Sequence, residues 1–448
     1  MNSDLIKKYD VPLPRYTSYP TVPYWEGNDI DAVQWADSVR KAYRVSGNKI
    51  SLYIHLPFCE SLCTYCACNM RVTRNHAVEE PYIAHVLKEW QMYVDIIGEQ
   101  PQIAELHLGG GTPTFFSPDN LDTLINGILK SARFAPEAAL SFEAHPAQTL
   151  PEHLETLYRL GFRRLSLGVQ DFDPHVQKLI NRKQNEMQVK ALSDMARIIG
   201  YTSVNYDLIY GLPGQTLKSI QDTVAKVIAM RPDRIAFYSY AHVPWVRPGQ
   251  RGYEDHDIPQ GADKRALYEL GRDMLLNAGY EEIGLDHFAL PGDKLLLAMQ
   301  QGTLHRNFMG YTEQHTDLLL GIGVSSISDT GTMFAQNLKS VEEWQKALDE
   351  GKLPLLRGHV MTAEDVQLRK HILDIMCKGE TDVDLKNNEI RLAIQRLEEL
   401  SKDGIVELHN NNVKVTKKGV AFLRNAGACF DARLHRAKPD AQVFSTAV

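Results

Sequence analysis

Short apolar runs alternate with longer amphipathic segments along the chain between Ser51 and Ser239. The short runs predict β-strands, and the amphipathic segments, with apolar residues three or four positions apart, predict α-helices. The expected strands are residues 51–55, 104–108, 139–143, 164–168, 203–209 and 234–238. The expected helices are residues 79–97, 118–132, 151–160, 186–199 and 217–229. Ser117 and Pro118 provide a start signal for the second helix, and Gly161 and Gly200 stand where two helices should end.

Alternation of strands and helices predicts βαβ units around a parallel sheet, which is either barrel-like or doubly wound. In both architectures the reactive groups lie at the carboxyl ends of the strands. Polar or glycine residues stand at or just after each of these ends: His55, Gly109, Gly110, Gly111, Glu143, Gln170, Asp207 and His242. Their repeated placement indicates a functional site at this edge of the sheet.

The chain after about Met361 has a different pattern. Residues 363–376 and 389–400 are expected to be helical, and residues 404–408 and 413–416 to form a hairpin around three asparagines. Helix, helix and hairpin is a winged-helix-like order. Because Lys414, Lys417 and Lys418 are few and have no interleaved aromatic residues, we favour a structural or lid role over DNA binding.

The bulk composition excludes several classes of protein. The chain has 448 residues, 44% of them hydrophobic and 23% charged, which is typical of a globular protein of two or three domains. It contains no apolar run of about 18 residues, so we expect no membrane span. The first ten residues have charges and no apolar core, so we expect no signal peptide and a cytoplasmic protein. The formal net charge of −7 argues against nucleic acid as the main partner.

Four of the six cysteines fall within ten residues, which points to metal or redox chemistry rather than a disulfide scaffold. They are Cys59, Cys63, Cys66 and Cys68, and the other two are Cys377 and Cys429. Soft thiolates select iron–sulfur clusters or zinc. A loop that supplies three ligands to a cubane leaves one iron open to a substrate. Zinc sites usually combine two separated ligand pairs, so one compact group favours the cluster. On spacing alone, Cys68 stays a possible fourth ligand.

A glycine-rich turn forms the second chemical signal. Gly109, Gly110, Gly111 and Thr112 follow an expected strand and precede a helix. Glycines there let the backbone approach a ligand closely, although such a turn often serves packing only. Beside the cysteines we favour ligand binding. Glu143 could accept hydrogen bonds from ribose hydroxyls, and its alternative is a surface carboxylate.

The cysteine loop, with Tyr65 beside Cys66, and the glycine turn resemble the radical S-adenosylmethionine (SAM) superfamily. Further motifs resemble the family of oxygen-independent coproporphyrinogen III oxidases (coproporphyrinogen dehydrogenases), from about Arg15 to Phe430. These motifs are residues 15–21 (RYTSYPT), Cys68, and residues 168–172 (GVQDF), 205–213 (NYDLIYGLP), 305–308 (HRNF) and 321–328 (GIGVSSIS).

The resemblance implies an α/β fold, a partial (β/α)6 TIM-like barrel with a mainly helical, winged-helix-like C-terminal domain. It implies an N-terminal segment near the active site (1–35), the barrel with an extension (36–355) and the C-terminal domain (356–448). It further implies that Cys59, Cys63 and Cys66 ligate a [4Fe-4S] cluster, whereas Cys68 is not a ligand. Glu143, Cys68 and Phe308 would be the catalytic residues.

The resemblance also implies two bound SAM molecules. The first would be held by Tyr53, Gly110, Glu143 and Ile327, with Tyr65 in the loop. The second would lie near Gly111, Thr112, Gln170, Arg182, Asp207 and Ala241.

The implied reaction is the oxidative decarboxylation of coproporphyrinogen III to protoporphyrinogen IX in haem biosynthesis. One electron cleaves SAM, and the resulting 5′-deoxyadenosyl radical removes hydrogen from a propionate side chain, which then loses CO₂ and an electron. The implied partners are a tetrapyrrole substrate and a reduced flavodoxin- or ferredoxin-type electron donor, with the chain acting as a monomer. Arg15 and Arg306 are candidate cations for the substrate carboxylates.

The chain departs from the pattern of the family at two places. Met309 stands where glutamine follows Phe308 in other members, and Ala144 and His145 replace a branched apolar residue and aspartate after Glu143. The rival functions are a haem-trafficking paralogue, a methyltransferase-type or ring-opening radical SAM enzyme that acts on another tetrapyrrole, and a zinc-stabilised regulator.

Overall fold

The computed structural model describes residues 3–27, 30–437 and 443–447. Its centre is a 12-stranded sheet in the order β16-β15-β14-β13-β1-β4-β5-β6-β7-β8-β10-β9. The six strands expected from the sequence lie side by side in this sheet and run parallel. They are β1 (Lys49–Leu56), β4 (Gln102–Gly110), β5 (Arg133–Ala144), β6 (Arg164–Gln170), β7 (Ser203–Tyr210) and β8 (Arg234–Ser239). Each contains the predicted strand, so the parallel α/β prediction is confirmed.

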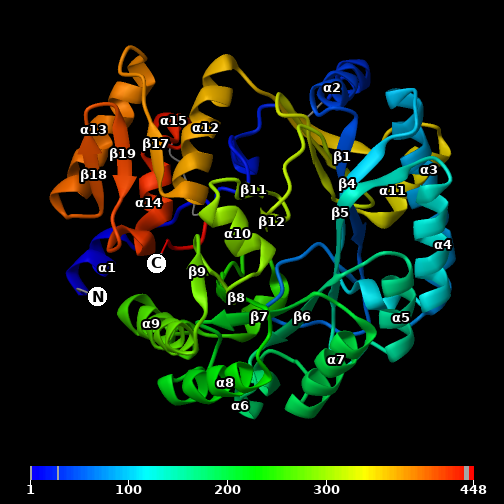
Figure 1. Ribbon diagram of the computed structural model, residues 1–448, viewed down its shortest axis with the longest axis horizontal. Helices are drawn as coiled ribbons and strands as arrows, with labels where there is room; N and C mark the ends of the chain where they lie inside the picture. Colours follow the sequence, from blue (N-terminus) through cyan, green and yellow to red (C-terminus); the bar gives the residue numbers. More distant parts are fainter. Residues whose placement is uncertain (1–2, 28–29, 438–442, 448) are drawn as a thin grey trace.

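The parallel strands curve around a central space, and helices cover their outer face (Figure 1). These helices are α3 (Glu79–Ile97), α4 (Pro118–Leu129), α5 (Pro151–Arg159), α6 (Pro174–Leu179), α7 (Glu186–Ile199) and α8 (Leu217–Met230). The Ser117 side chain caps α4 by accepting a hydrogen bond of 3.2 Å from the Asn120 amide. Gly200 ends α7 in the left-handed conformation, as the sequence indicates. The sheet stays open between its edge strands, so the barrel is partial.

Short antiparallel strands extend the barrel at both edges, and the sequence did not predict them. β13 (Leu319–Ile322) pairs with β1 in parallel and begins an extension with β14 (Ile327–Asp329), β15 (Met333–Asn337) and β16 (Leu355–Val360). The other edge has β10 (His287–Ala289) and β9 (Glu281–Ile283). A separate hairpin pairs β11 (His305–Asn307) with β12 (Gly310–Thr312). The remaining helices of this part are α2 (Ala32–Val45), α9 (Gly261–Asn277), α10 (Lys294–Gln300) and α11 (Val341–Asp349).

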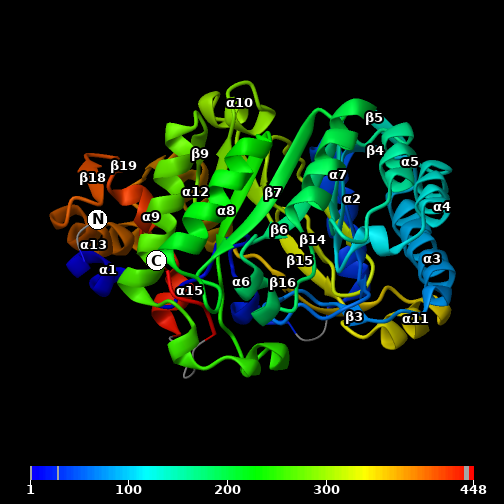
Figure 2. The ribbon, with the colours of Figure 1, turned by 90° about the horizontal axis from the view of Figure 1, so that it is seen from below.

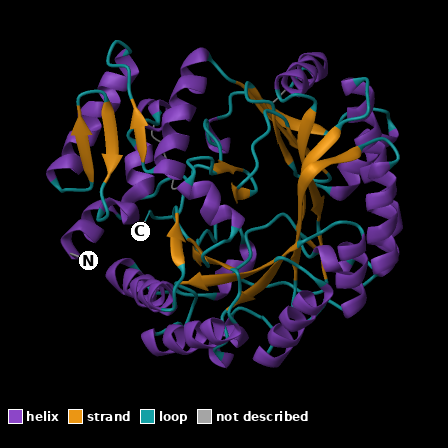
Figure 3. Ribbon diagram, in the orientation of Figure 1, coloured by secondary structure: helices purple, strands orange, loops and turns teal. Residues whose placement is uncertain are grey.

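The C-terminal part has its own small sheet, which Figure 3 separates clearly from the central one. The elements are α12 (Ala363–Lys378), β17 (Glu380–Asp382), α13 (Asn388–Lys402), β18 (Val406–His409), β19 (Asn412–Val415), α14 (Leu423–Ala428) and α15 (Ala432–Arg436). The predicted helix, helix and hairpin are confirmed, and β17 adds a strand that the sequence analysis missed. Figure 2 shows this part at the end of the molecule opposite α3, α4 and α5. Among the described residues, no helix has the length and apolarity needed to cross a membrane.

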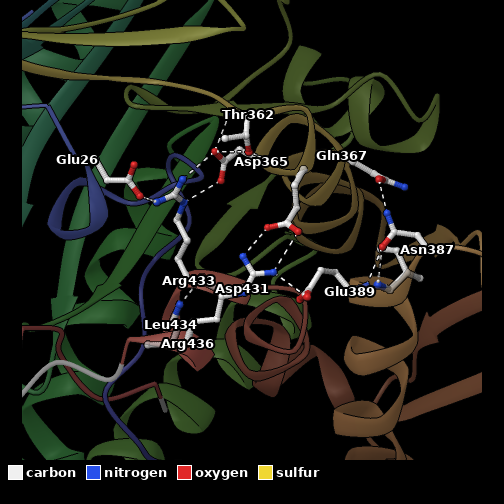
Figure 4. Close-up of polar contacts among 12 residues, drawn as sticks. Glu26, Thr362, Asp365, Gln367, Asn387, Glu389, Asp431, Arg433, Leu434 and Arg436 are labelled. Atoms are coloured by element: carbon white, nitrogen blue, oxygen red, sulfur yellow. Dashed lines mark hydrogen bonds and ion pairs between the residues drawn. The ribbon is translucent and has the colours of Figure 1, made fainter.

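The N-terminal segment joins the C-terminal core. One apolar cluster joins this segment to residues of α12, α13 and α14. It contains Leu5 and Ile6 of α1 (Ser3–Tyr9) and Tyr16, which follows that helix. The buried Arg424 guanidinium donates to the carbonyl of Pro14 at 3.0 Å. Arg433 of α15 binds Glu26 on one side and Asp365 of α12 on the other (Figure 4). The domain boundaries at residues 35/36 and 355/356 stay a prediction.

One buried carboxylate joins the outer helices to the extension. Glu89 of α3 is fully buried and accepts hydrogen bonds from the Gly323 amide at 2.8 Å, the Trp344 indole at 2.9 Å and the Asn337 side chain at 2.6 Å. Burial raises the pKa of Glu89 from 4.5 to about 7, although these hydrogen bonds lower it. Folding therefore favours the protonated form of the Glu89 carboxyl relative to the unfolded chain.

We predict that Glu89→Ala lowers the free energy of unfolding by about 3 kcal/mol or more, since it leaves buried donors unpaired. Glu89→Gln keeps the shape and should cost less. Because the folded pKa is raised, the stabilisation from Glu89 is complete below pH 4.5 and is lost as the pH rises to about 7. The stability difference between the unmodified protein and Glu89→Gln should therefore shrink over that interval in denaturant titrations. A stability difference that stays constant over this pH interval would contradict the raised pKa of Glu89.

Candidate functional site

The cysteine loop leaves the barrel directly after β1. It begins at β2 (Phe58–Cys59), which pairs in parallel with β3 (Arg71–Val72), so both ends of the loop are fixed. Inside the loop, the Cys66 amide donates to the carbonyl of Cys63 at 3.1 Å. This turn and the short strand pair hold Cys59, Cys63 and Cys66 in one compact segment.

The glycine turn contacts this loop through its backbone. The Gly111 amide donates to the carbonyl of Leu56 at 2.8 Å, and the Thr112 amide donates to the carbonyl of Phe58 at 3.0 Å. A Cβ atom at Gly111 would lie 2.5 Å from the Pro57 carbonyl oxygen, which is closer than atoms can approach. Gly110 has a φ of 120°, which favours glycine. The glycines therefore allow the loop and the end of β4 to lie against each other.

The two segments and the ends of neighbouring strands enclose one cavity of about 230 Å³, which we call the site cavity. It is lined by Cys59, Ser61, Cys63, Tyr65, Cys66, Cys68, Met70, Gly110, Gly111, Thr112, Pro113, Glu143, Ala144, His145, Gln148, Gly168, Gln170, Arg182, Asp207 and Tyr238. The structure thus brings together most of the residues predicted from the sequence. Four predicted residues, Tyr53, Ala241, Ile327 and Phe308, lie outside this lining.

Glu143 lies between the site cavity and a smaller cavity of about 170 Å³ inside the barrel, the inner cavity, and lines both. One oxygen accepts a hydrogen bond of 3.3 Å from the Gly110 amide, and the other lies 3.5 Å from the His107 ring. The side chain is still 44% exposed. Its remaining acceptor capacity therefore faces the cavities and is available to a ligand.

Arg182 connects three parts of the site. Its guanidinium donates to the Gly168 carbonyl at the end of β6 and lies 3.5 Å from the Tyr65 hydroxyl and 3.6 Å from the Cys63 thiol. A fourth contact, of 3.1 Å, joins it to the Gln184 side chain. A buried cation is therefore fixed directly beside one candidate metal ligand.

Asp207 provides a buried acid on β7. Its oxygens accept hydrogen bonds of 2.8 Å from the Ser166 hydroxyl and 2.9 Å from the Asn205 side chain. Burial raises the pKa of Asp207 to about 6, although the Ser166 hydrogen bond lowers it. Like Glu143 and Tyr238, Asp207 lines both cavities, so these residues form the boundary between them.

The four other predicted residues lie around this site. The Tyr53 hydroxyl is 3.0 Å from the His55 ring, and its own ring stacks on His107. Ala241 follows β8, and its carbonyl accepts from Gln250, whose side chain also donates to the Tyr65 carbonyl at 2.9 Å.

Ile327 belongs to the extension of the barrel, and Phe308 to the separate β11–β12 hairpin. Ile327 begins β14, where its backbone lies against Gly321. Phe308 stands in the β11–β12 turn and packs edge-on against Trp25 and Phe334.

Sequence analysis missed several residues of the site cavity. Tyr238 and Gln148 carry no local motif, so only the fold could identify them. The Gln148 side-chain oxygen is buried without a hydrogen-bond partner among the described residues. His145 was noticed only as a departure from the family pattern. Burial and the Arg182 guanidinium lower the pKa of His145 to about 3, so its imidazole is neutral in the folded protein.

The side chains that line the site cavity fit an iron–sulfur cluster and a small polar ligand bound beside it. The three thiols face one cavity and form no disulfide. The three cysteines stand on one loop, whereas zinc sites usually combine two separated ligand pairs. The unpartnered Gln148 oxygen and the free capacity of Glu143 provide acceptors for a ligand that carries hydrogen-bond donors.

Comparison with known proteins places the chain in a family. The profile of the radical SAM superfamily matches residues 53–227. The oxygen-independent coproporphyrinogen III oxidase of Salmonella typhimurium strain LT2 is 38% identical over 99% of this chain and 98% of its own length. The enzyme of the same name from Pseudomonas aeruginosa is 37% identical over 97% and 96%. The chain belongs to the oxygen-independent coproporphyrinogen III oxidase family.

A solved structure of the family agrees in fold. Coproporphyrinogen III oxidase from Escherichia coli, described as a radical SAM enzyme, superposes with a TM-score of 0.90 at 36% sequence identity. The match covers 96% of this chain and 98% of that one. The prediction of a radical SAM oxidase with a partial barrel is therefore confirmed, and membership of the superfamily implies a [4Fe-4S] cluster and SAM as cofactors.

We predict that Gly111→Ala displaces the cysteine loop from the end of β4. The new methyl group meets the Pro57 backbone, so the variant should lose about 1–3 kcal/mol of stability and part of its iron after anaerobic reconstitution. Gly252→Ala is the matched control, because a Cβ there has no atom within 4 Å. Iron and sulfide assays with thermal denaturation measure both effects. Full iron content in Gly111→Ala would show that the close contact is dispensable.

Proposed function

We propose that this chain catalyses the oxygen-independent oxidative decarboxylation of coproporphyrinogen III to protoporphyrinogen IX, the activity for which its family is named. The observation that carries the proposal is that Cys59, Cys63, Cys66, the glycine turn and Glu143 line a single cavity. They do so in a chain that matches the family over nearly its whole length.

When bound, the cofactors would supply the difficult chemistry, which is one-electron reduction by the cluster and radical hydrogen abstraction through SAM. The residues of the chain hold and orient these groups. Cys59, Cys63 and Cys66 would ligate three irons and leave the fourth open. Cys68 would line the cavity without ligating, as an additional catalytic group with Glu143 and Phe308.

We propose that the first SAM lies against Gly110 and Glu143, with Tyr53, Tyr65 and Ile327 around it. The open acceptor capacity of Glu143 supports this position, because ribose hydroxyls and the amino group of SAM are hydrogen-bond donors. Tyr53 would act mainly by fixing His55 and His107 beneath the site.

We further propose that a second SAM lies on the Arg182 side of the cavity. This position is supported by the lining of the cavity, which includes Gly111, Thr112, Gln170 and Asp207. Ala241 is linked to the cysteine loop because Gln250 donates to the carbonyls of both Ala241 and Tyr65. Arg182 would then face the carboxylate of the second SAM, since it is the buried cation of this wall.

The tetracarboxylate substrate needs cations near the site. Arg15 is the better candidate, because its side chain is 32% exposed and is held by a 2.6 Å hydrogen bond to the Ser239 carbonyl at the end of β8. Arg306 is buried over the Tyr311 ring and donates to the Arg15 carbonyl, so it would position Arg15 instead. Met309 lines the inner cavity, where it contributes an apolar surface in place of an amide.

A reduced flavodoxin- or ferredoxin-type protein would supply the electron, and the chain would act as a monomer in the cytoplasm. Free thiols at all six cysteines support a reducing compartment. The rival haem-trafficking and methyltransferase functions are less favoured, because the chain retains Cys68 and the 15–21 motif together.

Anaerobic incubation of the reconstituted protein with dithionite, SAM and coproporphyrinogen III tests the function. We expect 5′-deoxyadenosine and a divinyl product. Alanine at Cys59, Cys63 or Cys66 should abolish both and remove the bound iron, whereas Cys68→Ala, the matched control, should keep its iron. The proposal would fail if the unmodified protein cleaved no SAM. 5′-Deoxyadenosine with a different tetrapyrrole product would favour the methyltransferase-type alternative.

Arg15→Gln should raise the KM for coproporphyrinogen about tenfold and change kcat less, because it removes one charge-assisted contact to a substrate carboxylate. Steady-state kinetics under anaerobic conditions measure the changes in KM and kcat separately. Arg40→Gln removes an exposed arginine from α2 and should leave both constants unchanged. An equal rise in KM in Arg15→Gln and Arg40→Gln would exclude a substrate contact by Arg15.

A further inference from the structure

The cysteine loop reaches the outer surface beside the turn between α6 and α7. Leu62, which precedes Cys63, is 38% exposed, and its carbonyl accepts a hydrogen bond of 2.7 Å from the Asn181 side chain. The Thr64 amide donates to the Ile180 carbonyl at 3.1 Å. Two hydrogen bonds therefore join the loop and the turn into one continuous surface.

A hollow beside this surface shares one lining residue with the site cavity. A hollow of about 530 Å³ opens between α6 and α7, and Lys178, Asn181 and Lys183 stand around it. Arg182 lines both this hollow and the site cavity, and its guanidinium lies 3.6 Å from the Cys63 thiol. The hollow is therefore one side chain away from a proposed cluster ligand.

Large apolar side chains are exposed on a segment that touches the same loop. Trp245 is 48% and Val246 is 58% exposed, on the segment that follows β8. Gly249 of that segment lies against Leu62, since a Cβ atom there would be 3.5 Å from the leucine side chain. Grouped apolar residues rimmed by polar ones are typical of protein–protein interfaces.

The charges around these apolar residues are positive. Lys178, Lys183, Arg247 and Arg251 form no ion pair with any carboxylate whose side chain the structure describes; Arg251 donates instead to the Pro244 carbonyl.

Two acidic residues of the neighbouring segment have described side chains and contact a histidine. Glu254 and Asp257 contact His256, and His256 and Asp257 face another hollow beside α8 and α9. A local positive surface on a chain with a net charge of −7 suits an acidic partner.

We propose that an acidic one-electron carrier protein docks on this surface, which is formed by Leu62, Lys178, Lys183, Trp245, Val246 and Arg251, and that the electron enters past Arg182. The inference rests on the proposed function, since it requires a reducible cluster at Cys59, Cys63 and Cys66. The carrier loses one electron and the cluster gains it; no bond forms or breaks and no proton moves.

The test compares two reductants on the same reconstituted, full-length protein. Lys178→Glu/Lys183→Glu and, separately, Trp245→Ala are mixed anaerobically with reduced flavodoxin, and bleaching of the cluster absorbance is followed by stopped flow. We expect reduction of the charge-reversal variant to be at least about tenfold slower at low ionic strength, with the difference narrowing as salt is added. Trp245→Ala should be slower at all salt concentrations.

Dithionite, a small reductant that needs no docking surface, should reduce every variant at the unmodified rate. Lys386→Glu/Lys417→Glu is the matched control, because it makes the same charge change at exposed lysines of the C-terminal part. Equal slowing in that control, or unchanged reduction of Lys178→Glu/Lys183→Glu by flavodoxin, would overturn the docking site while leaving the proposed function intact. If dithionite reduces no cluster in the unmodified protein, the proposed function fails and the docking site fails with it.

Discussion

The site depends on the backbone contact between the end of β4 and the residues that follow β1. The Gly111 amide and the Thr112 amide bond to the carbonyls of Leu56 and Phe58, and the absence of a side chain at Gly111 lets the strands meet at Pro57. This contact places the loop of candidate ligands against the glycine turn and beside Glu143, which accepts from the Gly110 amide. Without it, the cysteines and Glu143 would belong to two separate surfaces, and no shared cavity would exist.

Arg182 extends this arrangement outward. Its guanidinium meets Cys63, Tyr65 and Gly168, so one buried charge joins the cysteine loop to the end of β6. A cation beside a thiolate ligand favours the negatively charged states of the cluster, and it also attracts an anionic cofactor group. The same side chain also lines the hollow between α6 and α7. Cofactor binding and electron entry would therefore depend on one residue, which the resemblance marks for SAM binding and no local pattern marks for electron entry.

The sequence predicts elements whose pattern is local and misses those defined by tertiary pairing. The parallel strands and their helices have regular apolar periodicity, so their existence was evident. In contrast, β13 and β15 are short and buried at every position, so they lack the alternation that marks a strand. The spacing of the cysteines predicts a metal or cluster site, but only the resemblance separates Cys68 from the three proposed ligands. Tyr53, Ile327 and Phe308 came only from resemblance, and Gln148, Tyr238 and Gln250 come from distant segments that no local pattern connects.

The C-terminal part holds the N-terminal segment against the barrel opening. Arg424 binds the Pro14 carbonyl, Asp431 accepts a hydrogen bond of 3.1 Å from the buried Tyr16 hydroxyl, and Arg433 joins Glu26 to Asp365. Arg15 lies between these anchors and reaches the end of β8. Arg424 and Arg433 of the winged-helix-like part therefore bind groups of the chain itself. A structural role in closing the site explains this part better than nucleic-acid binding. The position of a candidate substrate cation thus depends on residues more than 400 positions away in the sequence.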